Sequence, residues 1–207
     1  MEVIILTDTH GKLRRAELEN AITEKNPDCI FCLGDIAYSD YEIIQDTLAE
    51  RECKVPVLAV LGNHDPCTRL DEVQKDFFPE IINLDCKTTE VCGFTIGGFA
   101  GSVKYKSGDH YCVRTQEQAQ NSIKVLPKVD VLLCHSQPSF DTQVLLDVTE
   151  EGISQNAHNG LYAIGEYIIQ NNPRYVFHGH LHDRFFEAHG NTIVVCCYGV
   201  DNDTVHL

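Results

Sequence analysis

The sequence predicts a single α/β domain, and three features of its pattern support this class. Short apolar runs alternate with longer amphipathic segments. Polar residues follow directly after most of the apolar runs, and no linker, repeat or low-complexity segment divides the chain. At 207 residues the protein is long enough for one well-packed core. We therefore expect one domain over residues 1–207.

The first elements alternate between strand and helix. They are a strand at 3–7, a helix at 13–25, a strand at 29–33, a helix at 41–51 and a strand at 57–61. Such alternation predicts parallel strands joined by right-handed crossovers. In open α/β sheets, ligands bind beyond the carboxyl ends of the strands, so those ends are where a site is expected.

The middle of the chain changes character. Residues 81–84, 88–96 and the glycine-rich 97–101 favour hairpin strands over another crossover, which predicts a mixed sheet. Alternation then resumes with a helix at 116–125, a strand at 129–134, a helix at 161–170 and a strand at 175–177. Residues 183–189 and 192–198 flank Gly190-Asn191, the turn signal of a final hairpin.

The net charge of −15 bears on possible partners. It argues against stable binding to nucleic acid, whose phosphates require a basic face. It does not exclude a phosphate-bearing small molecule, because bound cations can make one pocket locally positive.

The expected compartment follows from the apolar runs and the cysteines. The chain has no apolar run of about 18 residues and begins with a strand-like segment instead of a secretory signal, which predicts a cytoplasmic protein with no membrane partner. The ten cysteines are expected to be reduced thiols. Cys29 and Cys32, like Cys196 and Cys197, lie in apolar runs and are expected to pack in the core.

Candidate functional residues follow five apolar runs. In chain order they are Asp8-Thr9-His10-Gly11, Gly34-Asp35, Gly62-Asn63-His64-Asp65, Cys134-His135 and Gly179-His180-Leu181-His182. Each motif alone is weak, since turns and single histidines are common. Together they supply oxygen and imidazole donors at the ends of separate strands, a donor set that suits manganese, iron, cobalt or zinc.

These motifs resemble those of the calcineurin-like metallophosphoesterases, whose pattern is Asp-x-His, Gly-Asp, Gly-Asn-His-(Asp/Glu), a later His and Gly-His-x-His. The resemblance spans residues 8–182, and the size is similar to that of the compact prokaryotic members. It implies a four-layer α/β/β/α sandwich with two mixed sheets. It also implies two divalent metal ions, with Asp8, His10 and His182 at the first, Asn63, His135 and His180 at the second, and Asp35 as the bridge. Manganese is the expected metal, with iron, zinc, cobalt or nickel as alternatives.

The implied activity is hydrolysis of a phosphoester by a metal-bridging hydroxide. His64 would be unligated and, with Asn63, would stabilise charge on the phosphoryl oxygens. His64 is also a candidate proton donor to the leaving group, with Asp65 as the carboxylate that would keep it charged.

Three alternatives stay open. A phosphodiesterase acting on a small molecule is favoured, while a phosphomonoesterase acting on a small molecule or phosphoprotein would use the same metal core. Residues 36–39 replace the Asp-Arg-Gly element of the phosphoprotein phosphatases, which argues against protein dephosphorylation. The third alternative is a metal-binding scaffold without chemistry, and the oligomeric state is left open. A DNA nuclease is disfavoured by the acidic charge.

Several residues outside the motifs also have expected surroundings. His178 is expected to hydrogen-bond beside the ligands, with a structural role or a third metal as alternatives. Solvent exposure is expected for His110, His158, His189 and His206. Residues 136–159 either overhang the metals or form an ordinary surface excursion. Lys104 and Lys106 are expected to be solvated, a second phosphate contact being the alternative.

Overall fold

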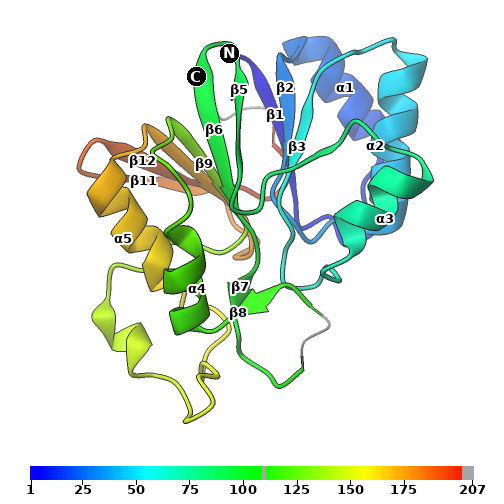
Figure 1. The fold of residues 1–207 in the computed structure, drawn as a ribbon. Helices are drawn as coiled ribbons and strands as arrows, with labels where there is room; N and C mark the ends of the chain where they lie inside the picture. Colours follow the sequence, from blue (N-terminus) through cyan, green and yellow to red (C-terminus); the bar gives the residue numbers. More distant parts are fainter. Residues whose placement is uncertain (109–110, 202–207) are drawn as a thin grey trace.

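Two mixed β-sheets form the centre of the molecule. The computed structural model describes residues 1–108 and 111–201. In Figure 1 the two sheets lie side by side, with α1 to α3 on the outer side of one and α4 and α5 on the outer side of the other. The single α/β domain with two mixed sheets in four layers is confirmed.

The first sheet has five strands in the order β13-β1-β2-β3-β4. Its strands β1 to β4 run parallel, and β13 is antiparallel to β1. The helices α1, α2 and α3 make the crossovers. The bounds are β1 Val3–Thr7, α1 Arg15–Lys25, β2 Cys29–Cys32, α2 Tyr38–Glu50, β3 Val57–Ala59, α3 Arg69–Asp76, β4 Ile82–Asn83 and β13 Gly199–Asp201.

The second sheet has six strands in the order β11-β12-β10-β9-β6-β5. Its two edge hairpins, β5–β6 and β11–β12, are antiparallel and its inner pairs are parallel. The bounds are β5 Thr88–Val91, β6 Phe94–Phe99, α4 Gln116–Ile123, β9 Val131–Cys134, α5 Tyr162–Asn171, β10 Tyr175–His178, β11 Phe185–His189 and β12 Thr192–Cys196. A small parallel pair, β7 Ser102–Val103 and β8 Val113–Arg114, and the 3₁₀ turn Thr142–Leu145 lie outside it.

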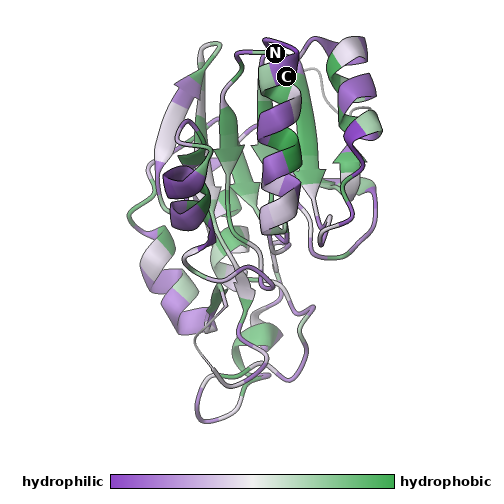
Figure 2. Ribbon diagram, turned by 90° about the vertical axis from the view of Figure 1, so that its right-hand side faces the viewer, coloured by the Kyte–Doolittle hydropathy of each residue, from purple (hydrophilic) through white to green (hydrophobic). Residues whose placement is uncertain are grey.

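Side chains that alternate between the two faces of the second sheet fill two hydrophobic cores. On β9, Val131 and Leu133 pack in the core between the sheets, whereas Leu132 and Cys134 pack against α4 and α5. Successive side chains of a strand point to opposite faces, so a strand covered on both sides must be apolar throughout. Figure 2 faces the side of α1 to α3 and shows apolar strands of the first sheet behind helices in which hydrophilic and hydrophobic segments alternate along the ribbon.

Some boundaries differ from the sequence expectation. Helix α3 was not predicted because it is eight residues long and buries only Leu70 and Val73, too few for a visible period. Residues 82–83 do not join the β5–β6 hairpin but continue the first sheet beside β3. Helix α2 begins three residues earlier than expected, where the buried Asp40 carboxylate accepts the Ala37 N–H in the first turn.

The structure also tests the expectations for the cysteines and for membrane-spanning helices. Cys29, Cys32, Cys196 and Cys197 are buried, as expected, and all ten cysteines are free thiols. Burial raises the pKa of Cys29 to about 12, so this thiol stays protonated and packs as an apolar group. In the two described ranges, no helix is both long enough and apolar enough to cross a membrane.

Candidate metal centre

The carboxyl ends of five strands meet at one edge of the molecule. The chain leaving β1 contributes Asp8 and His10, and that leaving β2 contributes Asp35. The chain leaving β3 contributes Asn63, His64 and Asp65, while β9 and β10 lead into His135 and into His180 and His182. All nine residues singled out in the sequence are therefore positioned by strand ends of the two facing sheets.

The backbone at this edge is unusual. Five of the seven expected metal ligands are non-glycine residues with positive φ: Asp8 (54°), His10 (48°), Asp35 (53°), His180 (69°) and His182 (54°). Such conformations are costly and cluster at functional sites, where surrounding contacts hold them in place. A purely structural role for these loops does not require so many residues with positive φ at one edge of the molecule.

The glycines of the motifs allow a close approach of the loops. A Cβ on Gly179 would lie 2.1 Å from Thr7 Oγ1 and 2.3 Å from Asp8 Oδ2. One on Gly62 would lie 2.2 Å from Asp35 Oδ1. Both positions exclude any side chain, so the glycines keep the two carboxylates in contact with neighbouring backbone.

The first donor set consists of Asp8, His10 and His182. His182 Nε2 lies 3.3 Å from Asp8 Oδ1 and 3.3 Å from His10 Nε2. Asp8 Oδ1 is buried and has no hydrogen-bond donor in the part of the chain that the structure describes. A buried carboxylate oxygen without a donor fits a cation, because desolvated charge otherwise carries a large cost.

The second donor set includes Asp8, Asp35 and His135. His135 Nε2 lies 2.9 Å from Asn63 Oδ1 and 3.5 Å from Asp35 Oδ2, and the His180 ring is 5.1 Å from the His135 ring. Asp35 Oδ2 also lies 3.8 Å from His10 Nε2. One oxygen of Asp35 therefore faces donors of both sets, as a bridging carboxylate would.

Backbone carbonyls orient two of the imidazoles. His135 Nδ1 lies 2.8 Å from the Leu33 carbonyl, and His180 Nε2 lies 3.0 Å from the Ala157 carbonyl. A neutral ring donates its N–H to such a carbonyl and keeps the lone pair of its other nitrogen for a ligand. A neutral His135 would thus present Nε2, and His180 presents Nδ1.

Protonation of the donors follows from burial and charge. Burial lowers the pKa of His10 and lowers that of His180 to about 4, so both rings are neutral and able to bind a metal at pH 7. Burial would raise the pKa of Asp35, but nearby His135 outweighs it and keeps that carboxyl ionised. Burial likewise opposes a charge on His135, yet the Asp35 carboxylate outweighs burial and raises the His135 pKa.

His64 and Asp65 occupy different environments. His64 is exposed, its ring stands edge-on to His10 with centroids 5.3 Å apart, and its N–H donates to Asp35 Oδ1 at 2.7 Å. The Asp65 carboxylate is buried and accepts the N–H groups of Asp35 and Gly62. Burial raises the pKa of Asp65 to about 7. Asp65 thus holds in position the two loops that carry the expected ligands Asp35 and Asn63.

Asp40 is a positioning residue that the sequence pattern did not reveal. Its buried carboxylate accepts Thr9 Oγ1–H at 2.6 Å, the Gly11 N–H at 2.8 Å and the Leu13 N–H at 3.2 Å. These contacts tie the loop that carries Asp8 and His10 to the start of α2. A signal was available, since an acidic residue in a helix first turn often accepts backbone N–H groups.

Part of segment 136–159 lies over the second donor set. The Ala157 carbonyl reaches His180 Nε2, and the exposed His158 ring lies 5.0 Å from the His180 ring. The sequence left open whether segment 136–159 overhangs the site, and residues 157–158 do so. His158 is exposed as expected, but it borders the site.

The other histidines lie in varied surroundings. His178 is buried, its Nδ1 contacts the Gly179 carbonyl at 3.0 Å, and burial lowers its pKa to about 4. This contact is with the backbone of the next residue and not with a side chain of an expected ligand, so the hydrogen bond beside the ligands stays a prediction. His189 is half-buried, contrary to expectation, because it stacks on Phe140 with centroids 3.9 Å apart. His110 and His206 lie outside the described residues.

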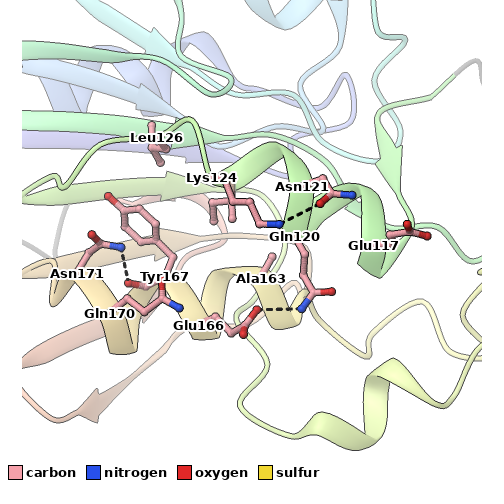
Figure 3. Close-up of a pocket in the computed structure, with 11 residues that line it drawn as sticks. Glu117, Gln120, Asn121, Lys124, Leu126, Ala163, Glu166, Tyr167, Gln170 and Asn171 are labelled. Atoms are coloured by element: carbon pink, nitrogen blue, oxygen red, sulfur yellow. Dashed lines mark hydrogen bonds between the residues drawn. The ribbon is translucent and has the colours of Figure 1, made fainter.

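A separate groove of about 530 Å³ lies between α4 and α5 (Figure 3). Two pairs of its polar side chains are hydrogen-bonded: Gln120 donates to Glu166 at 3.0 Å, and Lys124 donates to Asn121 at 3.1 Å. None of the residues lining it belongs to the donor sets. The chemistry is therefore expected at the strand ends and not in this groove.

Comparison with known proteins identifies the family. The family described as "Calcineurin-like phosphoesterase superfamily domain" matches residues 1–197. The chain therefore belongs to the calcineurin-like phosphoesterases, and the resemblance inferred from the motifs is confirmed. No curated protein sequence matches it significantly.

Solved structures share the fold at low sequence identity. The protein TT1561 of Thermus thermophilus superposes with a TM-score of 0.65 at 18% identity, covering 95% of this chain and 88% of that one. The phosphopantetheinyl hydrolase of Mycobacterium tuberculosis gives 0.60 at 12% identity, covering 96% and 89%. A novel archaeal phosphodiesterase gives 0.54 at 15% identity, covering 96% and 84%.

Proposed function

We propose that this protein hydrolyses phosphoesters with a dinuclear metal centre. The observation that carries the proposal is Asp35 Oδ2, which faces His10 Nε2 of the first donor set and His135 Nε2 of the second. The orphaned Asp8 Oδ1 supports it independently. The ligands are the seven residues expected from the motifs.

The protein residues have distinct tasks in this proposal. Two divalent cations would supply the Lewis acidity that lowers the pKa of a shared water and neutralises phosphoryl charge. Asp8, Asp35 and the four ligand histidines hold and space them, and carbonyls of Leu33 and Ala157 fix two of the rings. The exposed His64 ring is available to protonate a leaving-group oxygen.

The favoured substrate is a small phosphodiester. Its support is the compact fold, and two proteins of the same fold bear the names phosphodiesterase and phosphopantetheinyl hydrolase. A phosphomonoesterase would use the same donors. Manganese and a cytoplasmic location also stay predictions.

The first experiment pairs metal content with turnover on one sample. Metal is measured by plasma mass spectrometry, and hydrolysis of bis-p-nitrophenyl phosphate and p-nitrophenyl phosphate is followed after manganese is added. Close to two metals per chain with diester turnover supports the proposal. Faster monoester turnover would replace it with a phosphatase, whereas metal without any turnover would favour the scaffold.

Metal binding is expected to stabilise the fold. Manganese at 100 times its Kd should raise the free energy of unfolding by about 2.7 kcal/mol, because it binds the folded donors only. For a domain of this size that corresponds to a Tm increase of about 5–10 °C. Thermal denaturation with manganese or with a chelator measures it. Equal Tm values in both conditions would contradict the centre.

His64→Ala is expected to slow diester hydrolysis by about 10²–10³-fold while both metals remain bound. The loss should be larger for substrates with a strongly basic leaving group, because these need the proton that His64 donates. His189→Ala is the matched control, since His189 stacks on Phe140 away from the donors. Loss of metal from the His64 variant would show instead that His64 is a ligand.

A further inference from the structure

Tyr105, in the connection between β7 and β8, reaches the second donor set. Its hydroxyl oxygen lies 3.3 Å from Asn63 Nδ2. The Asn63 amide oxygen points the other way, to His135 Nε2 at 2.9 Å. Asn63 thus faces the second donor set with its oxygen and Tyr105 with its nitrogen. No sequence motif drew attention to this tyrosine.

The hydrogen-bond inventory leaves one proton of Tyr105 available. The Asn63 amide nitrogen is a donor only, so the Tyr105 oxygen accepts in this contact. Within residues 1–108 and 111–201, the structure gives the Tyr105 O–H no acceptor. The hydroxyl is therefore able to donate to a group bound beside Asn63.

The position of Tyr105 is held from both sides. The preceding residue, Lys104, donates its N–H to the Arg114 carbonyl at 2.7 Å and accepts the Ser154 N–H at 2.7 Å. The following residue, Lys106, places its ammonium 5.1 Å from the Tyr105 ring centroid and 4.8 Å from that of Tyr111. The contact of Lys104 with Ser154 joins this connection to segment 136–159, in which the Ala157 carbonyl contacts His180 Nε2.

We propose that Tyr105 donates a hydrogen bond to a phosphoryl oxygen of the substrate bound at the Asn63 side of the centre. The inference rests on the proposed function and adds a substrate-binding residue from outside the strand-end motifs. Lys106 places positive charge beside it, which an anionic group needs in a chain of net charge −15. No covalent step is involved.

The test compares Tyr105→Phe with Tyr111→Phe in the manganese-loaded protein. Tyr111 is a matched control because it contacts the same Lys106 ammonium and its described contacts include none of the metal donors. Loss of one donor to a charged phosphoryl oxygen should lower kcat/KM for bis-p-nitrophenyl phosphate by about 10–100-fold. Binding of inorganic phosphate, measured by calorimetry, should weaken by about tenfold with manganese affinity unchanged. Tyr111→Phe should stay within about twofold of wild type.

Two results would overturn the inference. Unchanged kcat/KM and phosphate affinity in Tyr105→Phe would show that its hydroxyl meets no phosphoryl oxygen. Loss of one manganese ion from that variant would show that Tyr105 only orients Asn63 as a ligand. A third result separates the inference from the proposed function. If the wild-type protein hydrolyses no phosphoester but Tyr105→Phe binds phosphate more weakly than wild type, the proposed function fails and the contact of Tyr105 with the anion stands.

Discussion

Asp35→Ala is expected to abolish diester hydrolysis, with kcat/KM lower by at least about 10³-fold, and to lower metal content from two ions per chain to one or none. Asp35 Oδ2 faces both donor sets, at 3.8 Å from His10 Nε2 and 3.5 Å from His135 Nε2. In the proposed centre its removal would take one donor from each cation, and metal assistance contributes several kcal/mol of transition-state stabilisation.

Metal content and kinetics are measured on the same preparations. Asp46→Ala is the matched control, because Asp46 is an exposed aspartate on α2, and it should retain both metals and full activity. The manganese-dependent increase in Tm should also disappear in Asp35→Ala. Two tightly bound metals in that variant would show that the sets do not share Asp35.

The donors were predictable because each follows an apolar run. A buried parallel strand is readable from sequence, and the residue after it lies at the edge where ligands bind. The strand ends predict that Asp8 and Asp35 lie at one edge of their sheet, and the resemblance to the metallophosphoesterases implies that His135 joins them. The pairing of His135 Nδ1 with the Leu33 carbonyl could not be predicted, because residues 102 positions apart meet only through the packing of the two sheets.

The short elements were not predictable. Strand β13 has three residues and pairs with β1 at the other end of the chain, so neither length nor alternation marks it. Its pairing is non-local, and tertiary contacts decide it. Tyr105 was missed for a related reason: the connection between the parallel strands β7 and β8 brings it to Asn63, 42 residues earlier.

The contact of Asp40 with the loop of Asp8 and His10 was missed because the start of helix α2 was predicted three residues too late. A helix expected to begin at residue 41 leaves Asp40 in a loop, where an aspartate is unremarked. The helix begins at Tyr38, which places Asp40 in the first turn, fully buried, with its carboxylate turned toward the loop of Asp8 and His10. Its contribution to the site is indirect, through the position of that loop.

Asp40→Ala is expected to lower the free energy of unfolding by about 3–5 kcal/mol, even with a chelator present. The substitution leaves Thr9 Oγ1–H and the N–H groups of Gly11, Leu13 and Ala37 without their acceptor. Hydrogen bonds to a charged group contribute about 1.5–3 kcal/mol each, and buried donors left unpaired add a desolvation cost, although the losses do not add fully. Urea denaturation with a chelator measures the change apart from metal binding.

Two variants separate this effect from a general helix effect. Asp40→Asn keeps one acceptor oxygen, so its free energy of unfolding should fall by about half as much as that of Asp40→Ala. The free energy of unfolding of Asp46→Ala, an exposed position on the same helix, should stay within about 0.5 kcal/mol of wild type. The decrease in the free energy of unfolding caused by Asp40→Ala should be larger with manganese than with chelator, because a displaced His10 weakens metal binding in the folded state. A loss under about 1 kcal/mol, equal in both conditions, would mean that the loop of Asp8 and His10 keeps its position without Asp40.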